Sequence, residues 1–351
     1  STALTKLNMD EVEKAIRKWK NYPSVYGIFD LQPAGRGLYN YDILKLNAEE
    51  RKNFKKQIEA VATRYDAKVV YEESYGEKCK NVKERALFAG CRACKTKIHI
   101  LPNGWVTPCV FLRDKCFWIV KWTYGKRITE IWKAITAKRK NLKKHPDSTC
   151  LKCGFFINCM GGCTANSYNL CGKLELPDPT CPNREINIKT RRLNIRQAFL
   201  YDAKAYTKIF AKNNIRFMRA NYLGEKQWRK KLSAVYCNDN QKIFTILNLR
   251  KQPIGSINVK FLDKTQRTGE IGIIISKSEQ NKGYGREALR AILQYLFSNT
   301  PLKELYYKTI CENRASVHLI RKIKGATFLG TGIETIKGKK RKIEIYKICK
   351  K

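Results

Sequence analysis

The pattern of apolar and polar positions divides the chain into three stretches. In the first, apolar residues recur at helical spacing over 8–22 and 47–65, and each of these segments is followed by a short apolar run, at 25–31 and at 67–71. A helix and a buried strand, repeated twice, are typical of a parallel α/β sheet or barrel. Because residues 1–78 are too few to close a barrel, the pattern predicts a partial one.

The last stretch, 189–351, alternates strands and helices without this regular order. Two hairpins are expected in it, one turned by residues 250–253 and one at the end of the chain. The predicted strands span 193–199, 242–249, 254–262, 269–276, 302–309, 327–333 and 343–348. The predicted helices span 202–213, 224–236, 283–297 and 313–323. We therefore expect a multidomain protein that combines α/β and α+β architecture.

The middle stretch, 79–188, is rich in cysteine. A hairpin is predicted over 97–107 and a short helix over 128–140. Eight well-spaced cysteines lie in it, at Cys91, Cys94, Cys109, Cys150, Cys153, Cys159, Cys163 and Cys181. Two thiolate sets of four can hold tetrahedral zinc or iron–sulfur clusters, and the spacing decides only partly between them. In a long, lysine-rich chain without a secretory leader, we expect metal-bound thiolates rather than disulfides.

The composition adds a strong positive charge. The 351 residues carry a formal net charge of +41, which raises the question of nucleic-acid binding. The charge is dispersed along the whole chain and lacks the aromatic–basic interleaving of an RNA-binding motif, so nucleic acid is not expected as a partner. A basic surface can equally steer an anionic substrate. No apolar run is long enough to span a bilayer, so we expect a cytoplasmic protein with no membrane partner; the sequence does not predict its oligomeric state.

The cysteine spacing also carries a family resemblance. The segment 100–109, the run C-x2-C-x5-C-x3-C and the ending Pro-Asp-Pro-Thr-Cys look like the SPASM domain of radical SAM enzymes. That resemblance implies two auxiliary [4Fe-4S] clusters with interleaved ligands. The first implied set is Cys91, Cys94, Cys109 and Cys163. The second is Cys150, Cys153, Cys159 and Cys181, while Cys79 and Cys116 stay open as alternatives in the first set.

The stretch 1–78, with its loop 32–37, resembles the last strands of the radical SAM barrel. The C-x3-C-x2-C motif of that barrel is absent from this chain. Either a longer form carries it upstream or the barrel is a relic. We therefore expect S-adenosylmethionine only in a longer form, and clusters that either hold the domain together or relay electrons.

A glycine-containing loop opens the helix predicted at 283. Such a turn directs free backbone N–H groups and a helix dipole at an anion, which indicates a phosphate site. The string Gly283-x-Gly285-x-x-Ala288 also resembles a dinucleotide fingerprint. That fingerprint places its first glycine directly after the strand, whereas about six residues intervene here. The dinucleotide reading is therefore disfavoured.

Gln280-x-x-Gly283-x-Gly285, with Asn313-x-x-Ser316 further on, resembles the motifs of GNAT acetyltransferases. The resemblance implies a mixed sheet over 189–351, acetyl-CoA as the acyl donor and a primary amine as the acceptor, in an amino-sugar nucleotide or a peptide. The implied CoA-binding residues are Ile273, Ile275, Gln280, Lys282, Gly283, Tyr284, Gly285, Arg286 and Asn313.

Two residues are candidates for catalysis. Glu270 is the candidate base, with a solvated strand end as the alternative. Many members of the resembled family have a tyrosine acid at the position of Ile320, so the usual acid is missing here. Ser316 is the candidate in its place, with helix capping or packing as the alternative. We therefore predict an N-acetyltransferase. The alternative is a redox or binding module of a radical SAM enzyme that modifies peptides or sugars, in which the last domain is degenerate.

Overall fold

The computed structural model describes residues 2–19, 21, 25–72, 90–125, 127–138, 142, 144–211, 215, 217–218, 222–236 and 238–350. The chain divides into two compact units, Ser1–Glu185 and Ile186–Lys351. Each is described separately below. Within the described residues, no helix has the length and apolar character needed to cross a membrane.

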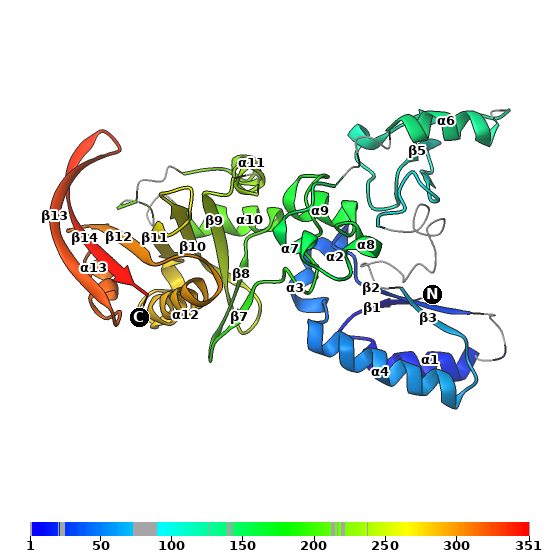
Figure 1. Ribbon diagram of the computed structural model, residues 1–351, viewed down its shortest axis with the longest axis horizontal. Coiled ribbons are helices and arrows are strands. Elements are labelled where there is room, and N and C mark those ends of the chain that lie inside the picture. Colours follow the sequence, from blue (N-terminus) through cyan, green and yellow to red (C-terminus); the bar gives the residue numbers. More distant parts are fainter. Residues whose placement is uncertain are drawn as a thin grey trace. The chain divides into compact units, whose positions relative to one another are not determined.

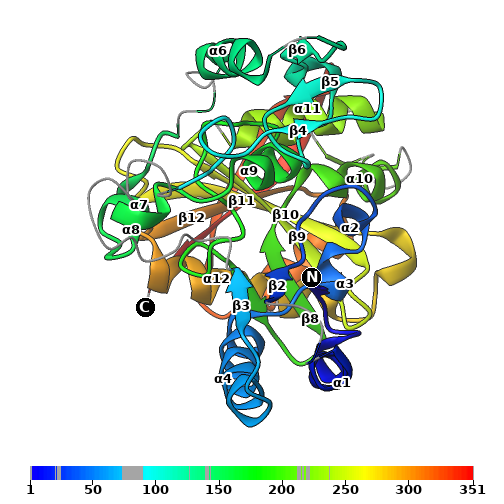
Figure 2. The same ribbon diagram turned by 90° about the vertical axis from the view of Figure 1, so that its right-hand side faces the viewer.

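The N-terminal part of the first unit is a three-stranded parallel sheet. Its strands are β1 (Thr2–Leu4), β2 (Tyr26–Asp30) and β3 (Val69–Glu72), in the order β1-β2-β3. Helices α1 (Val12–Trp19) and α4 (Ala48–Arg64) lie against one face (Figures 1 and 2). The parallel pairing of the two predicted strands is confirmed. Strand β1 was not predicted, because three residues are too few to show a period.

Local sequence explains where α4 begins. The Asn47 side chain accepts hydrogen bonds from the backbone N–H groups of Glu49 and Glu50, and the Glu50 carboxylate accepts from the N–H of Asn47. This reciprocal capping satisfies N–H groups that have no partner within the helix. The helix then buries Phe54 and Ile58 against Ile28 of the sheet. Short helices α2 (Arg36–Tyr39) and α3 (Tyr41–Leu44), together with the 3₁₀ turn η1 (Met9–Glu11), complete this part.

The cysteine-rich part of the same unit is small and irregular. Its antiparallel sheet has the order β4 (His99–Ile100), β5 (Trp105–Thr107), β6 (Val120–Lys121), and the predicted hairpin over 97–107 is confirmed. Val106 of this sheet packs with Ile131 and Ile135 of α6 (Ile128–Lys138). Further helices among the described residues of this part are η2 (Lys115–Phe117), α7 (Ser148–Leu151), α8 (Phe156–Cys159) and α9 (Thr164–Cys171).

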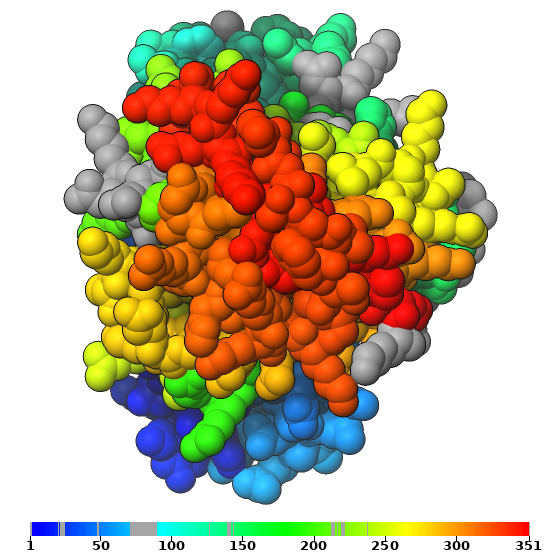
Figure 3. Space-filling view, turned by 90° about the vertical axis from the view of Figure 1, so that its left-hand side faces the viewer, coloured from blue at the N-terminus to red at the C-terminus, as the bar shows by residue number. Residues whose placement is uncertain are grey.

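The second unit is built on one eight-stranded mixed sheet, in the order β13-β14-β12-β11-β10-β9-β8-β7. The strands are β7 (Asn187–Lys189), β8 (Leu193–Gln197), β9 (Gln241–Asn248), β10 (Pro253–Phe261), β11 (Thr268–Ile275), β12 (Glu304–Ile310), β13 (Ala326–Ile336) and β14 (Lys339–Cys349). All seven predicted strands are present. Strand β7, at the sheet edge, was not predicted. Figure 3 shows the surface of the β13–β14 hairpin in orange and red.

Helices cover both faces of this sheet (Figure 1). Helix α12 (Tyr284–Asn299) and α13 (Arg314–Arg321) share one core with the sheet, in which Leu289 and Ile292 lie among Phe244 and Leu305. Helices α10 (Ala203–Ile209) and α11 (Glu225–Val235) share the other core, which contains Trp228. The turn η4 (Leu200–Asp202) lies between β8 and α10, and η5 (Lys277–Glu279) lies between β11 and α12. Helix α10 ends at Ile209, earlier than predicted, and residues 212–213 of that prediction lie outside the described residues.

The sheet opens between its two parallel central strands. Strands β11 and β12 pair at only three positions, from Thr268 opposite Glu304 to Glu270 opposite Tyr306. Strand β11 nevertheless continues to Ile275 and β12 to Ile310. Within the described residues, the second halves of both strands therefore have no ladder partner on these facing edges.

Candidate functional site

The glycine loop after β11 is fixed at both ends. The Gln280 side-chain Nε2 donates to the carbonyl oxygen of Ile275 at 2.9 Å, and Nη1 of Arg192 donates to that of Lys282 at 2.9 Å. Gly283 follows at the N-cap of α12 with φ of +81°, which favours glycine. An added Cβ there would lie 3.3 Å from Nη2 of Arg192. These two hydrogen bonds therefore hold the loop in position directly N-terminal to α12.

Glu287 in the first turn of α12 ties the loop to β7 and β8. It accepts from Thr190 Oγ1 at 2.6 Å and from Arg192 Nε at 2.7 Å. Burial raises the pKa of the Glu287 carboxyl, but these hydrogen bonds outweigh burial, and the net pKa is lowered. The Arg192 guanidinium also lies 4.7 Å from the ring centroid of Tyr284. Sequence analysis missed Thr190 and Arg192, which are close to the loop only in three dimensions.

Cationic side chains flank this helix N-terminus. Lys282 pairs with Glu279 at 3.0 Å, and Arg286 lies in the first turn of α12. With the N–H groups of the loop and the dipole of a sixteen-residue helix, this is an environment suited to a phosphate group. The residues predicted to bind phosphate, Gln280 to Arg286, thus lie in the glycine loop and in the first turn of α12.

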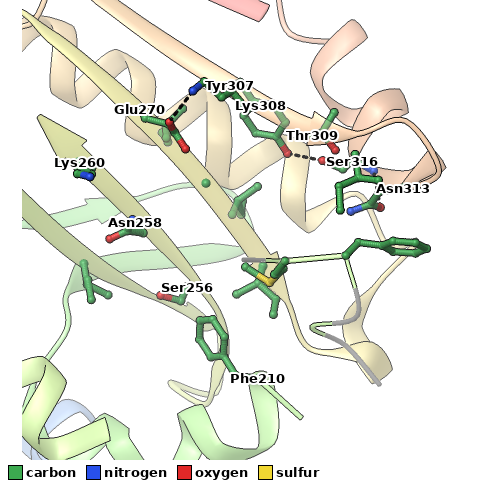
Figure 4. Close-up of a pocket in the computed structure, with 18 of the residues that line it drawn as sticks. Phe210, Ser256, Asn258, Lys260, Glu270, Tyr307, Lys308, Thr309, Asn313 and Ser316 are labelled. Carbon is green, nitrogen blue, oxygen red and sulfur yellow. Dashed lines mark hydrogen bonds and ion pairs between the residues drawn. The ribbon is translucent and has the colours of Figure 1, made fainter. Parts of the chain in front are cut away.

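A cavity of about 330 Å³ lies where β11 and β12 separate. Figure 4 shows polar side chains on its walls, including Asn258, Glu270 and Ser316. Aromatic side chains of Phe210 and Trp228 also contribute. Of the two predicted strand residues, Ile273 lines the cavity, while Ile275 packs into the core under α12.

Ser316 lines this cavity in contact with a buried tyrosine. Its hydroxyl lies 2.8 Å from that of Tyr307 on β12, a residue only 3% exposed (Figure 4). Burial raises the pKa of Tyr307, and the hydrogen bond with Ser316 lowers it in part. The Asn313 side chain accepts from the backbone N–H of Ser316 at 3.3 Å and caps α13. Tyr307 was missed because a tyrosine within a buried strand is indistinguishable from core by pattern.

Glu270 lines the same cavity from β11. Its Oε2 lies 3.5 Å from Nζ of Lys308, which lies at the same distance from Oε1 of Glu334. Figure 4 shows the Glu270–Lys308 pair on the cavity wall. The fold thus brings together Glu270 and Ser316, which are 46 positions apart in the sequence.

Two cysteines of the first unit, Cys163 and Cys159, each lie near other cysteines. Burial raises the pKa of the Cys163 thiol well above its ordinary value, and nearby Cys91 and Cys109 raise it further. Burial also raises the pKa of Cys159 to about 11, and nearby Cys181 and Cys150 contribute. These neighbours fall within the first and the second predicted ligand set, respectively.

Further side chains approach the second set. The Asn183 side-chain Nδ2 lies 3.4 Å from the sulfur of Cys153, and Nη1 of Arg184 lies 3.9 Å from that of Cys150. N–H donors aimed at sulfur stabilise thiolates. In the described part of the chain, however, no three His, Cys, Asp or Glu side chains are arranged to hold one metal ion. The donor chemistry suits a cluster, although the spacing of these side chains does not form a complete site.

The alternatives for the first set differ in position. Cys116 is exposed, with its sulfur 3.9 Å from the Tyr168 hydroxyl, and Cys79 lies outside the described residues. Cys94 is 1% exposed and has φ of +56°, a backbone conformation rare outside glycine.

Comparison with known proteins covers both units. Residues 192–325 match the family model of an acetyltransferase (GNAT) domain. The uncharacterized N-acetyltransferase YnaD of Bacillus subtilis is 29% identical over 143 residues, which are 39% of this chain and 81% of that protein. Mycofactocin maturase MftC of Mycolicibacterium smegmatis is 25% identical over 184 residues, which are 52% of this chain and 46% of the maturase. The chain thus spans less than half the length of that relative.

The names of a third relative and of one solved structure both refer to a spermidine acetyltransferase. The spermidine N(1)-acetyltransferase of Vibrio cholerae is 29% identical over 85 residues, or 24% of this chain and 49% of that protein. The crystal structure of spermidine N-acetyltransferase from Vibrio cholerae with CoA and spermine aligns with a TM-score of 0.43 and 21% identity, over 46% of this chain and 97% of that one. Residues 192–325 of the chain are thus similar to a GNAT acetyltransferase domain.

Proposed function

We propose that residues 189–351 transfer an acetyl group from acetyl-CoA to a primary amine of a small molecule or peptide. The observation that carries the proposal is the separation of β11 from β12 after Glu270. Beyond Glu270, the described residues of β11 have no ladder partner on the side of β12, and this edge leads from the cavity toward the glycine loop. Such an edge can pair with the amide groups of the pantetheine arm, as extended peptides pair with sheet edges. The loop from Gln280 to Arg286 would then bind the pyrophosphate.

The cavity supplies groups for the chemistry of acyl transfer. The amine nitrogen attacks the thioester carbonyl carbon, the C–S bond breaks, and the amine loses a proton while the thiolate gains one. Glu270 is the group in the cavity that can accept the amine proton, directly or through water. Ser316 can donate a proton to the sulfur, with the Tyr307 hydroxyl, 2.8 Å away, hydrogen-bonded behind it. Holding both reactants in one cavity lowers the entropic part of the barrier.

Several classes of amine are candidate acceptors. Relatives carry names that refer to spermidine, and the sequence resemblance extends to amino-sugar nucleotides and protein N-termini. A cavity of about 330 Å³ is at the lower end of the range for small-molecule sites, so it suits one small acceptor or the end of a peptide.

The direct test is turnover by the full chain. Acetyl-CoA is incubated with a panel of amines, release of CoA is followed with a thiol reagent, and the acetylated product is identified by its mass. We expect product with at least one amine, and loss of that product with Ser316→Ala. If CoA is released only at the rate of hydrolysis for every amine, acetyl transfer is refuted.

For the first unit we propose a SPASM domain at 79–188, preceded by a barrel remnant at 1–78. Its two cysteine sets would hold two [4Fe-4S] clusters, which supply electron transfer when bound. The neighbourhoods of Cys163 and of Cys159 support the interleaved pairing. Anaerobic reconstitution should give about eight irons per chain with broad visible absorbance. Stoichiometric zinc without colour would refute the clusters.

The second candidate function is a redox or binding module in which the last domain no longer catalyses. The similarity of this chain to a maturase supports this second candidate. It predicts reconstituted clusters together with no acetylated product from any amine, whereas the acetyltransferase proposal predicts product whether or not iron is present.

A further inference from the structure

The charges around the cavity are unbalanced. Among the described residues, four side chains that line it carry a formal charge: three are lysines (Lys231, Lys260 and Lys308) and one is a carboxylate (Glu270). Lys308 pairs with both Glu270 and Glu334. In the described part of the unit, Glu270 is the one lining carboxylate and is paired with Lys308, so Lys231 and Lys260 have no lining carboxylate of their own.

Lys231 is the more enclosed of these two lysines. It lies on α11, is half-buried, and its Nζ is 4.8 Å from the ring centroid of Trp228. Among the described residues, no carboxylate lies within 4.0 Å of Nζ of Lys231 or Lys260. Burial lowers the pKa of Lys231, as expected for an ammonium that loses water without gaining a counter-ion. A desolvated cation without a partner is unfavourable until an anion joins it.

A second donor on the same helix also lacks an acceptor. The indole Nε1 of Trp228 is buried, with no hydrogen-bond partner in the described part of the unit. The connecting segment that carries Phe210, Phe217 and Met218 has no Asp or Glu anywhere from 203 to 224. The two α11 side chains that line the cavity in the described structure, Trp228 and Lys231, are thus both hydrogen-bond donors.

From these charges we infer that the acceptor amine also carries a negatively charged group, a carboxylate or a phosphate, which binds at Lys231. This inference rests on the proposed acetyl transfer and names its substrate class. Trp228 and Phe210 would contact an apolar part of the same molecule, while the amine faces Glu270. A polyamine would instead bring additional ammonium groups toward these lysines, and among the described lining residues only Glu270 is a carboxylate that could receive them. The cavity therefore disfavours polycations.

The test compares amines of different net charge. The full chain, saturated with acetyl-CoA, is assayed with Phe-Ala-Glu, Phe-Ala-Gln amide and Phe-Ala-Lys amide, all with free N-termini. Spermidine and an amino sugar with and without a phosphate complete the panel, so that carboxylate and phosphate are distinguished. We expect kcat/KM for anionic amines to exceed that for cationic ones by about tenfold or more, the size of one charged hydrogen bond.

Variants of α11 locate the effect. Lys231→Met should lower kcat/KM for anionic amines by about tenfold, mainly through KM, and leave the KM of acetyl-CoA unchanged. Lys231→Glu should shift the preference toward cationic amines. Lys230→Met is the matched control, because Lys230 is the adjacent residue, is exposed and does not line the cavity. Thermal melting of each variant verifies that it is folded.

The outcomes separate this inference from the proposed function. Equal or faster turnover of cationic amines by the wild-type chain, or the same shift in Lys230→Met as in Lys231→Met, overturns the inference while acetyl transfer stands. Absence of both acetyl-CoA binding and turnover refutes the proposed function itself.

Discussion

Variants of the hydrogen-bonded pair Ser316 and Tyr307 can distinguish a catalytic role of the serine from a purely structural one. Ser316→Ala removes a hydroxyl from the cavity and leaves the Tyr307 hydroxyl, in a residue 3% exposed, without its partner. A buried hydroxyl left without a hydrogen bond costs about 1–3 kcal/mol. Tyr307→Phe leaves the half-buried Ser316 hydroxyl able to bond water, so we expect a smaller loss of about 0.5–1.5 kcal/mol.

The double variant Ser316→Ala/Tyr307→Phe replaces both partners with apolar groups. Because no unsatisfied hydroxyl remains, its free energy of unfolding should fall by less than the sum of the two single losses. Its activity should not recover. If Ser316 protonates the leaving thiolate, both variants that lack it should lose about 10²–10⁴-fold in kcat, whereas Tyr307→Phe alone loses less.

Denaturant unfolding gives the stabilities, and steady-state release of CoA gives kcat. A Ser316→Ala protein that is destabilised yet keeps its kcat within about threefold would show that the serine only packs and caps. Recovery of kcat in the double variant would equally contradict a role for Ser316 in proton transfer.

Two further predictions concern Glu287 and Gly162. The folded-state pKa of Glu287 is lowered, so its stabilisation is present above its ordinary pKa of 4.5 and is lost as pH falls through the folded value. The stability difference between wild type and Glu287→Gln, from denaturant titrations at pH 7 and pH 3.5, should therefore shrink at the lower pH; an unchanged difference would contradict the bonding of this carboxylate. Gly162→Ala places a Cβ 2.5 Å from that of Asp178 at φ of +79°. The control Gly125→Ala has a similar φ of +87°, but its added Cβ would lie in open space. Both substitutions should cost about 1 kcal/mol in backbone strain, but Gly162→Ala should lower the denaturation midpoint of the first unit further, and equal losses would refute the close approach.

Much of the second unit could be predicted because its signals are local. The apolar period gives the strands of the sheet, and two glycines after a strand identify the N-terminus of α12. The capping box at Asn47 similarly marks the start of α4. Strands β1 and β7 were not predicted, because three residues are too few for a period and their pairing depends on distant partners.

The site could be predicted only in part, because its contacts are non-local. Glu270, Ser316 and the glycine loop have sequence signals, but Tyr307 resembles any buried strand residue. Lys231 resembles any lysine on an amphipathic helix, and only the packing of α11 places it beside the cavity. In the cysteine-rich part, spacing suggested two ligand sets, whereas the approach of Asn183 to Cys153 depends on the fold.

Calorimetric titration of acetyl-CoA into the full chain tests the central claim most directly. If the glycine loop and the free edge of β11 form a CoA site, the wild-type chain should bind one acetyl-CoA per chain, and CoA should compete. Gly283→Glu, which adds a bulky negative side chain at φ of +81° where the pyrophosphate would lie, should abolish that heat while the protein stays folded. No saturable binding by the folded wild-type chain, or unchanged binding by Gly283→Glu, would contradict the proposed acetyl-CoA site.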